Sequence, residues 1–184
     1  VVVTGGTGAL GTALSGLLSI GPSEVVGVST LNLAYRYRGQ AFGILPPLGS
    51  DPFSAAQNTA IWGTEADLFV TNVKGEVWHF DGATWAIAFT LPQTVTNGAN
   101  DVWGIGPGNV YVAGDDGKVY HFAGGTWTPE SVTGVALDKV WGSSSSDVWA
   151  FGSGSAFHRN GATWDSVPIG GAVISVSGTG PSDA

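Results

Sequence analysis

The stretch WHFDGATW (residues 78–85) recurs in nearly the same form as YHFAGGTW (120–127) and FHRNGATW (157–164). Each copy has an aromatic residue, a histidine, a turn that contains glycine, and then Thr-Trp. Such a repeat is typical of a small structural unit that cannot bury its apolar face alone and must stack on copies of itself. The repeat therefore predicts the architecture of the chain more strongly than any other feature.

A second signature precedes each of these stretches. It is Trp62-Gly63 in one copy, Trp103-Gly104 in the next and Trp141-Gly142 in the third, each after an aliphatic residue. Five or six residues after each tryptophan comes an acid or amide, which we expect to cap a turn before a β-branched or aromatic strand. These polar residues are Asp67, Asn109 and Asp147.

The repeat extends in a weaker form to both ends of the chain. YRYRGQAF (35–42) matches the hairpin, with Arg36 at the place of the histidine. Residues 175–178 take the place of the Val-Trp-Gly signature, and Val1-Val2-Val3 resembles the strand that should follow Ala184. The N-terminal and C-terminal segments would then complete one repeat unit together, which removes open sheet edges. Val1 and Ala184 are therefore expected to be neighbours, with 1–3 paired against 174–176.

The repeats together predict an all-β fold, a five-bladed β-propeller closed by N- and C-terminal strands that share one blade. We expect a single domain over 1–184, with repeats at about 15–57, 58–99, 100–138 and 139–174, and a shared blade from 175–184 plus 1–14. Only 11% of the residues are charged and 43% are hydrophobic, as expected when stacked blades bury both faces of most strands.

Charge and composition narrow the function classes. The net charge of −8 provides no cationic stripe for nucleic acid or an anionic membrane surface. No apolar run is long enough to be inserted in a membrane. The absence of cysteine excludes thiolate catalysis and zinc–thiolate sites.

The hairpins resemble a known family. FDGATW (80–85) is similar to the Asp-box of sialidase-type and photosystem-assembly-type propellers, whose pattern is roughly Ser-x-Asp-x-Gly-x-Thr-Trp. The serine is missing here, and Ala123 and Asn160 replace Asp81 in the other copies. The resemblance covers about residues 15–184 and implies a structural hairpin between outer strands. The count of five units is similar to that of tachylectin-type five-bladed lectins, which is a resemblance of architecture.

The N-terminus carries a competing motif. VVVTGGTGALG (1–11) resembles the nucleotide loop of short-chain dehydrogenases and polyketide ketoreductases, with Gly5, Gly8 and Gly11 placed to approach a pyrophosphate. The resemblance ends after about thirty residues, and the sequence has no Tyr-x-x-x-Lys pair. An NAD(P)-binding remnant is therefore the third hypothesis, and no cofactor is expected.

Two sets of recurring side chains are candidates for ligand contact. We expect the histidines to be held by hydrogen bonds between blades, as in WD-repeat propellers, with a repeated ligand contact as the alternative. Because they recur around a ring, they should not converge on one metal ion. The tryptophans should pack between blades, or alternatively act as platforms for sugar rings. The candidates are Trp62, Trp103, Trp141, His79, His121 and His158.

Binding is favoured over catalysis. The chain has only three arginines, too few for the arginine cluster of a sialidase, and no pair of catalytic acids can be assigned. We therefore expect no catalytic residues and no enzymatic activity. The favoured function is a multivalent carbohydrate-binding, lectin-like module at the cell surface or outside the cell. The alternative is a scaffold for protein–protein interaction, so the partner is a carbohydrate or a protein, in an oligomeric state that the sequence leaves open.

Overall fold

The structure is a computed structural model that describes residues 13–39, 41–50, 57–92, 98–161 and 163–178. These residues form sixteen strands in four separate four-stranded sheets, and within each sheet the strands pair antiparallel in chain order. The first sheet contains β1 (Leu14–Gly21), β2 (Glu24–Ser29), β3 (Ala34–Arg38) and β4 (Ala41–Ile44); the second β5 (Asn58–Gly63), β6 (Leu68–Asn72), β7 (Glu76–Phe80) and β8 (Trp85–Thr90); the third β9 (Ala99–Gly106), β10 (Asn109–Gly114), β11 (Lys118–Ala123) and β12 (Thr126–Ser131); the fourth β13 (Lys139–Ser144), β14 (Asp147–Gly152), β15 (Ser155–Asn160) and β16 (Thr163–Pro168).

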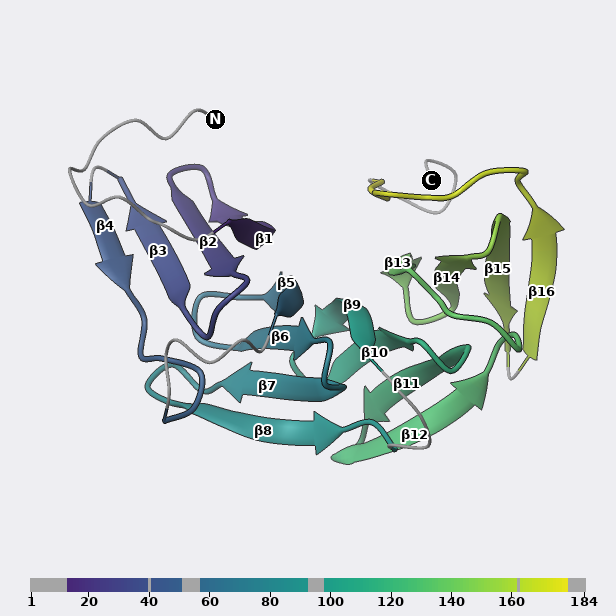
Figure 1. Cartoon of the computed structure of the whole chain (residues 1–184), viewed down its shortest axis with the longest axis horizontal. Coiled ribbons are helices and arrows are strands. Elements are labelled where there is room, and N and C mark those ends of the chain that lie inside the picture. Colours follow the sequence, from purple (N-terminus) through teal and green to yellow (C-terminus); the bar gives the residue numbers. More distant parts are fainter. Residues whose placement is uncertain (1–12, 40, 51–56, 93–97, 162, 179–184) are drawn as a thin grey trace.

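The four sheets stand side by side in an arc, as the blades of a β-propeller do (Figure 1). The first strand of each sheet (β1, β5, β9, β13) lies on the inner side of the arc, and the fourth strand (β4, β8, β12, β16) lies on the outer side. The sheets are called blades 1 to 4 below. The fold predicted from the repeats, an all-β propeller, is confirmed for these four blades.

The hydrophobic cores lie between blades. In β6, Leu68 and Val70 pack into the core shared with blade 1, whereas Phe69 packs into the core shared with blade 3. The alternation of side chains along a strand thus sends apolar groups to both faces. Equivalent cores join blades 1 and 2, blades 2 and 3, and blades 3 and 4. A blade therefore needs its neighbours to bury its apolar surface.

The Trp-Gly signature is a contact between neighbouring inner strands. A Cβ atom at Gly104 would lie 2.8 Å from the ring of Trp62 and 2.7 Å from the backbone oxygen of Asn109. A Cβ atom at Gly142 would lie 2.7 Å from the ring of Trp103. Real Cβ atoms do not come this close, so only glycine lets the indole of the preceding blade cover the strand. The tryptophan and the glycine of successive repeats are one packing unit.

The hairpin that resembles an Asp-box is a locally stabilised turn. The Asp81 carboxylate accepts hydrogen bonds from the backbone N–H groups of Ala83 (2.9 Å) and Thr84 (2.8 Å). The N–H of Thr84, together with that of Ala83, holds the pKa of Asp81 below its usual value. Ala123 and Asn160 occupy this place in the other copies. The Asp-box relationship therefore stays a hypothesis.

The fifth blade stays a prediction. Among the described residues, no hydrogen-bonded sheet joins blade 1 to blade 4. Residues 171–178 are described and are not in a strand, while 1–12 and 179–184 lie outside the described residues. The expected pairing of 1–3 with 174–176, the contact of Val1 with Ala184 and the glycine loop at Gly5, Gly8 and Gly11 therefore also lie outside them.

The face of blade 1 that points away from blade 2 is apolar and exposed. Leu17, Phe42 and Ile44 are 67%, 46% and 69% exposed, and Phe42 packs on the ring of Tyr37 at 4.9 Å between centroids. Among the residues that the structure describes, no helix is long and apolar enough to cross a membrane.

The substitution Gly104→Ala tests the packing unit. The added methyl group collides with the ring of Trp62, so we expect the free energy of unfolding to fall by about 1–3 kcal/mol in chemical denaturation. Gly106→Ala is the matched control, because a Cβ at Gly106 on the same strand meets no atom within 4 Å. The control should stay within about 0.5 kcal/mol of the parent. Equal effects of both changes would contradict the contact.

Candidate binding site at the junctions between blades

The inner-strand tryptophans lie between blades. Trp62 on β5 and Trp103 on β9 are half-buried, each against a glycine of the next blade, and Trp141 on β13 is buried. Trp103 and Trp141 both line a central cavity of about 300 Å³, with Asp101, Lys139 and the segment 174–176 among the other lining residues. Trp62 does not line this cavity, so the structure brings together two of the three predicted platforms.

The three histidines have one recurring environment. His79 Nε2 lies 3.1 Å from Asp67 Oδ1, and its ring stacks on Phe69 with 4.6 Å between centroids. His121 repeats this arrangement: its Nε2 lies 2.9 Å from Asn109 Oδ1, and its ring stacks on Tyr111 with 4.1 Å between centroids. In blade 4, His158 Nε2 lies 2.9 Å from Asp147 Oδ1, and the ring stacks on Trp149 with 4.1 Å between centroids.

Each of these partners belongs to the same blade as its histidine, so the expectation of hydrogen bonds between blades is wrong for these contacts. The structure puts the three histidines in three different blades and does not bring them together. The partners Asp67, Asn109 and Asp147 were expected only as turn caps. Their recurrence ahead of an aromatic residue was the signal that could have identified them.

Beside the histidine place of blades 1, 2 and 3, which holds Arg36, His79 and His121, the blade meets the next one at a junction, named here by its two blades. A junction contains residues of the second to fourth strands of the earlier blade. It also contains the turn between the first two strands of the later blade, and that blade's third and fourth strands. The repeat makes the three junctions 1–2, 2–3 and 3–4 comparable residue by residue. Their side chains differ, and the differences decide which junction is open.

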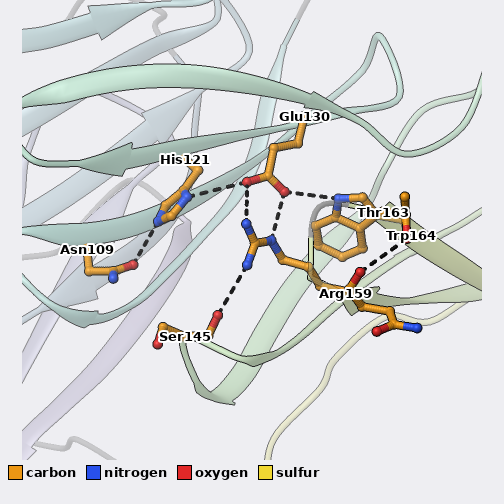
Figure 2. A network of polar contacts seen from close by, with 8 residues as sticks. Asn109, His121, Glu130, Ser145, Arg159, Thr163 and Trp164 are labelled. Atoms are coloured by element: carbon orange, nitrogen blue, oxygen red, sulfur yellow. Dashed lines mark hydrogen bonds and ion pairs between the residues drawn. The ribbon is translucent and has the colours of Figure 1, made fainter.

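Junction 3–4 is filled by an ion pair between blades (Figure 2). Arg159 of blade 4 donates two hydrogen bonds of 2.9 Å, from Nε and Nη2, to the carboxylate of Glu130 in blade 3. Arg159 Nη1 also donates to the backbone oxygen of Ser145 (3.3 Å), and Trp164 Nε1 donates to Glu130 (3.1 Å). His121 Nδ1 lies 3.4 Å from Glu130. The Glu130 carboxylate thus has several hydrogen-bond donors, and the side chains of the network fill junction 3–4.

The charges of this network shift the pKa values of its members. Burial pushes the pKa of Glu130 upward, but the hydrogen bonds and charge of Arg159 outweigh burial and hold the pKa below its usual value. Burial lowers the pKa of His121, and the charge of Arg159 adds to this against the opposing charge of Glu130. Burial also raises the pKa of Tyr111. Glu130 is therefore kept charged, and His121 is kept neutral, over a wider range of pH.

Junction 1–2 is also occupied by arginine. Arg36, at the histidine place of blade 1, donates from Nη2 to the backbone oxygen of Glu65 in blade 2 (2.5 Å). Arg36 Nε lies 3.2 Å from the Glu24 carboxylate. Arg38 pairs with Glu24 at 3.0 Å and with the carboxylate of Glu65. Two guanidinium groups and two carboxylates thus share this junction.

Junction 2–3 contains a cavity of about 230 Å³. Phe122 follows His121 as Arg159 follows His158. Glu130 pairs with Val119, and the residue that pairs with the equivalent Val77 is Phe89, because β8 has a bulge at Ala88. Aromatic residues thus replace both members of the ion pair. The described residues that line the cavity are Asp67, Phe69, His79, Ala88, Pro107, Phe122, Gly125 and Trp127.

The aromatic wall of this cavity is fixed by packing. The ring of Trp127 stacks on Phe89 of blade 2 with 5.0 Å between centroids and an interplanar angle of 11°, and it contacts Phe122 at 5.2 Å. Phe89 also packs on Tyr120, which is 1% exposed. Since these rings are anchored to the core between blades 2 and 3, the wall is preformed. His79 and Asp67 provide polar atoms beside it, with side chains 30% and 37% exposed.

Comparison with known proteins identifies the fold and no family. No family model and no curated protein matches the sequence. The chain is similar to the WD40 β-propeller domain of Doa1, at 9% identity and a TM-score of 0.66, with 84% of this chain and 54% of that one covered. It is similar to YCF48 bound to the D1 peptide, at 14% identity and a TM-score of 0.64, with 84% and 55% covered.

A third similar structure is the computationally designed protein Ika4, at 13% identity and a TM-score of 0.55, with 86% of this chain and 92% of that one covered. Because only 54% and 55% of the Doa1 and YCF48 chains are covered, this chain spans about half of their length. At these identities the likeness shows a β-propeller fold alone.

A double-mutant cycle tests the ion pair of junction 3–4. Arg159→Met leaves a half-buried carboxylate without its partner, so we expect a loss of about 2 kcal/mol in the free energy of unfolding. Adding Glu130→Gln should recover part of that loss, with a coupling energy of about 1–2 kcal/mol. Lys118→Met is the comparison, because its pair with Asp116 involves a more exposed ammonium group and should cost about 0.5 kcal/mol or less. Additive losses at Arg159 and Glu130 would refute the coupling.

The lowered pKa of Glu130 predicts a specific acid sensitivity. Since this pKa is lower in the folded than in the unfolded protein, the pair stabilises the fold above the ordinary glutamate pKa of about 4.3. That contribution disappears as the pH falls through the folded pKa. Denaturation between pH 6 and pH 2.5 should therefore show a shallower decline of stability for Glu130→Gln than for the parent chain. Parallel curves would show that Glu130 has no such role.

Proposed function

We propose that this chain is a non-enzymatic β-propeller scaffold that binds other proteins, and that junction 2–3 is where a partner is anchored. The observation that carries the proposal is the preformed cavity of about 230 Å³ at this junction, where no arginine stands among the lining residues, whereas Arg159 and Glu130 fill junction 3–4 and Arg36 and Arg38 fill junction 1–2. The chain therefore has a specific anchoring place rather than a uniform ring of equal clefts.

The chemistry of the cavity suits a protein partner. Three aromatic rings and a proline line it, and Asp67 and His79 add a polar pair at its margin. Binding energy at protein interfaces is concentrated where an anchoring side chain fills a desolvated aromatic pocket beside a few polar groups. The volume lies below the range of about 300–1,000 Å³ that is usual for small-molecule sites. It is better matched to one large side chain of a partner.

The structural comparisons favour this function over carbohydrate binding. YCF48, a propeller similar to this chain, has been solved with a peptide bound. None of the three similar structures described above is named for a sugar ligand. The rings of Trp62 and Trp103, the expected sugar platforms, are partly covered by glycine strands of the next blade. The lectin hypothesis is accordingly an outcome of the test below and is not the proposal.

Selection of random linear peptides displayed on phage, with the folded chain as target, tests the proposed function. We expect enrichment of peptides with affinities on the order of micromolar. Ala88→Trp should weaken their binding by at least about tenfold, because the indole fills the cavity. Ala83→Trp is the matched control, since it places the same side chain on the exposed hairpin turn outside the cavity, and its binding should be unchanged.

A glycan array is run in parallel with the same three proteins. Enriched peptides that bind the Ala88→Trp variant as well as the parent would overturn junction 2–3 as the anchoring place. Glycan binding without any enriched peptide would overturn the protein-binding function in favour of the lectin hypothesis.

A further inference from the structure

We infer that the cavity of junction 2–3 binds a cationic side chain of the partner, with arginine preferred. This inference rests on the proposed function and specifies the chemistry of the residue that the partner inserts. It follows from three observations, namely what fills the equivalent junctions, the charge balance of the three junctions, and the shape of the cavity wall.

The chain fills the other described junctions with its own guanidinium groups. It contains three arginines, and all three lie there, Arg36 and Arg38 in junction 1–2 and Arg159 in junction 3–4. In both places a guanidinium donates to a backbone oxygen of the turn between the first two strands of the later blade, at Glu65 and at Ser145. The architecture of a junction therefore accommodates arginine in two sequence contexts.

Junction 2–3 keeps the acceptors and lacks the cation. Its described lining contains no arginine or lysine. Pro107 of the equivalent turn lines the cavity, and a proline has no N–H but keeps its carbonyl acceptor. Asp67 stands where junction 3–4 has the neutral Asn109. In junction 3–4 the charges of Glu130 and Arg159 cancel, whereas in junction 2–3 the carboxylate of Asp67 faces the cavity without a cation among the lining residues.

The wall of the cavity suits a planar cation. Trp127, Phe122 and Phe69 offer aromatic surface, and a guanidinium group stacks on such rings while it donates hydrogen bonds in its plane. His79 takes one acceptor site of the Asp67 carboxylate, which has about four. The remaining sites can accept from a ligand. A lysine ammonium satisfies the charge but not the stacking, so arginine is preferred.

Titration with capped tripeptides, followed by the Trp127 indole and His79 ring signals in NMR spectra, tests this inference. The probes are Ac-Gly-Arg-Gly-amide, the lysine analogue, and the citrulline analogue, which has nearly the shape of arginine without its charge. We expect the arginine peptide to bind about tenfold more tightly than the citrulline peptide, with lysine between them.

The variant Asp67→Asn is designed on the chain's own repeat, because Asn109 already bonds to His121 in the equivalent place. It should keep the His79 contact and abolish the preference for arginine over citrulline. Asp147→Asn makes the same change in blade 4, outside the cavity, and should leave the preference intact. Thermal unfolding of both variants verifies that they are folded.

Equal affinity for arginine and citrulline, an undiminished preference in Asp67→Asn, or signal changes confined to the central cavity would overturn the inference. Selected peptides that contain no arginine or lysine, but whose binding is weakened by Ala88→Trp, would likewise overturn it. In that case the proposed protein-binding function would stand. Arginine binding at Asp67 with no peptide enriched in the selection would support the site chemistry and count against the protein-binding function.

Discussion

Burial of apolar side chains between neighbouring sheets is the constraint on which the rest of this molecule depends. Every described core is shared by two blades, and the strands within a blade send side chains alternately to both sides. The indole of one inner strand lies on a glycine of the next, which sets how closely the blades approach. Because the hydrophobic effect scales with the area removed from water, an isolated blade would leave about half of its apolar side chains exposed.

This packing also creates the junctions. The blades approach most closely at their inner strands, and the histidines of the third strands are held by hydrogen bonds and ring stacking within their own blades. A few side chains then decide whether a junction is filled. Arg159 and Glu130 fill junction 3–4, whereas the counterpart in junction 2–3, lined by Phe122 and Ala88, is open. Function can thus differ between junctions without a change in the fold.

The sequence predicted the fold because the repeat is a direct consequence of the packing. The spacing of Trp-Gly and Thr-Trp identified an all-β propeller, and the low fraction of charged residues indicated blades buried on both faces, as with Val77 and Phe80 on opposite faces of β7. The cavity was not predicted, because Ala88 of its lining is an extra residue at a bulge of β8, and Arg159, which fills the equivalent place in junction 3–4, departs from the phenylalanine of the other copies. An analysis based on likeness passes over such positions. The histidine partners were missed for a related reason. Capping a turn is enough to explain an acid such as Asp67 in the sequence. Its contact with His79 becomes visible only once β6 and β7 are known to pair.

The central claim is that junction 2–3 is an open copy of a place that arginine fills elsewhere in the chain. A crystal structure of the chain soaked with methylguanidinium tests it most directly. The account predicts a planar cation in the cavity, stacked on the aromatic wall and within hydrogen-bond distance of the Asp67 carboxylate, while junctions 1–2 and 3–4 keep their own arginines. A cavity that is closed by its own side chains, or a cation bound elsewhere with this place left to solvent, would contradict it.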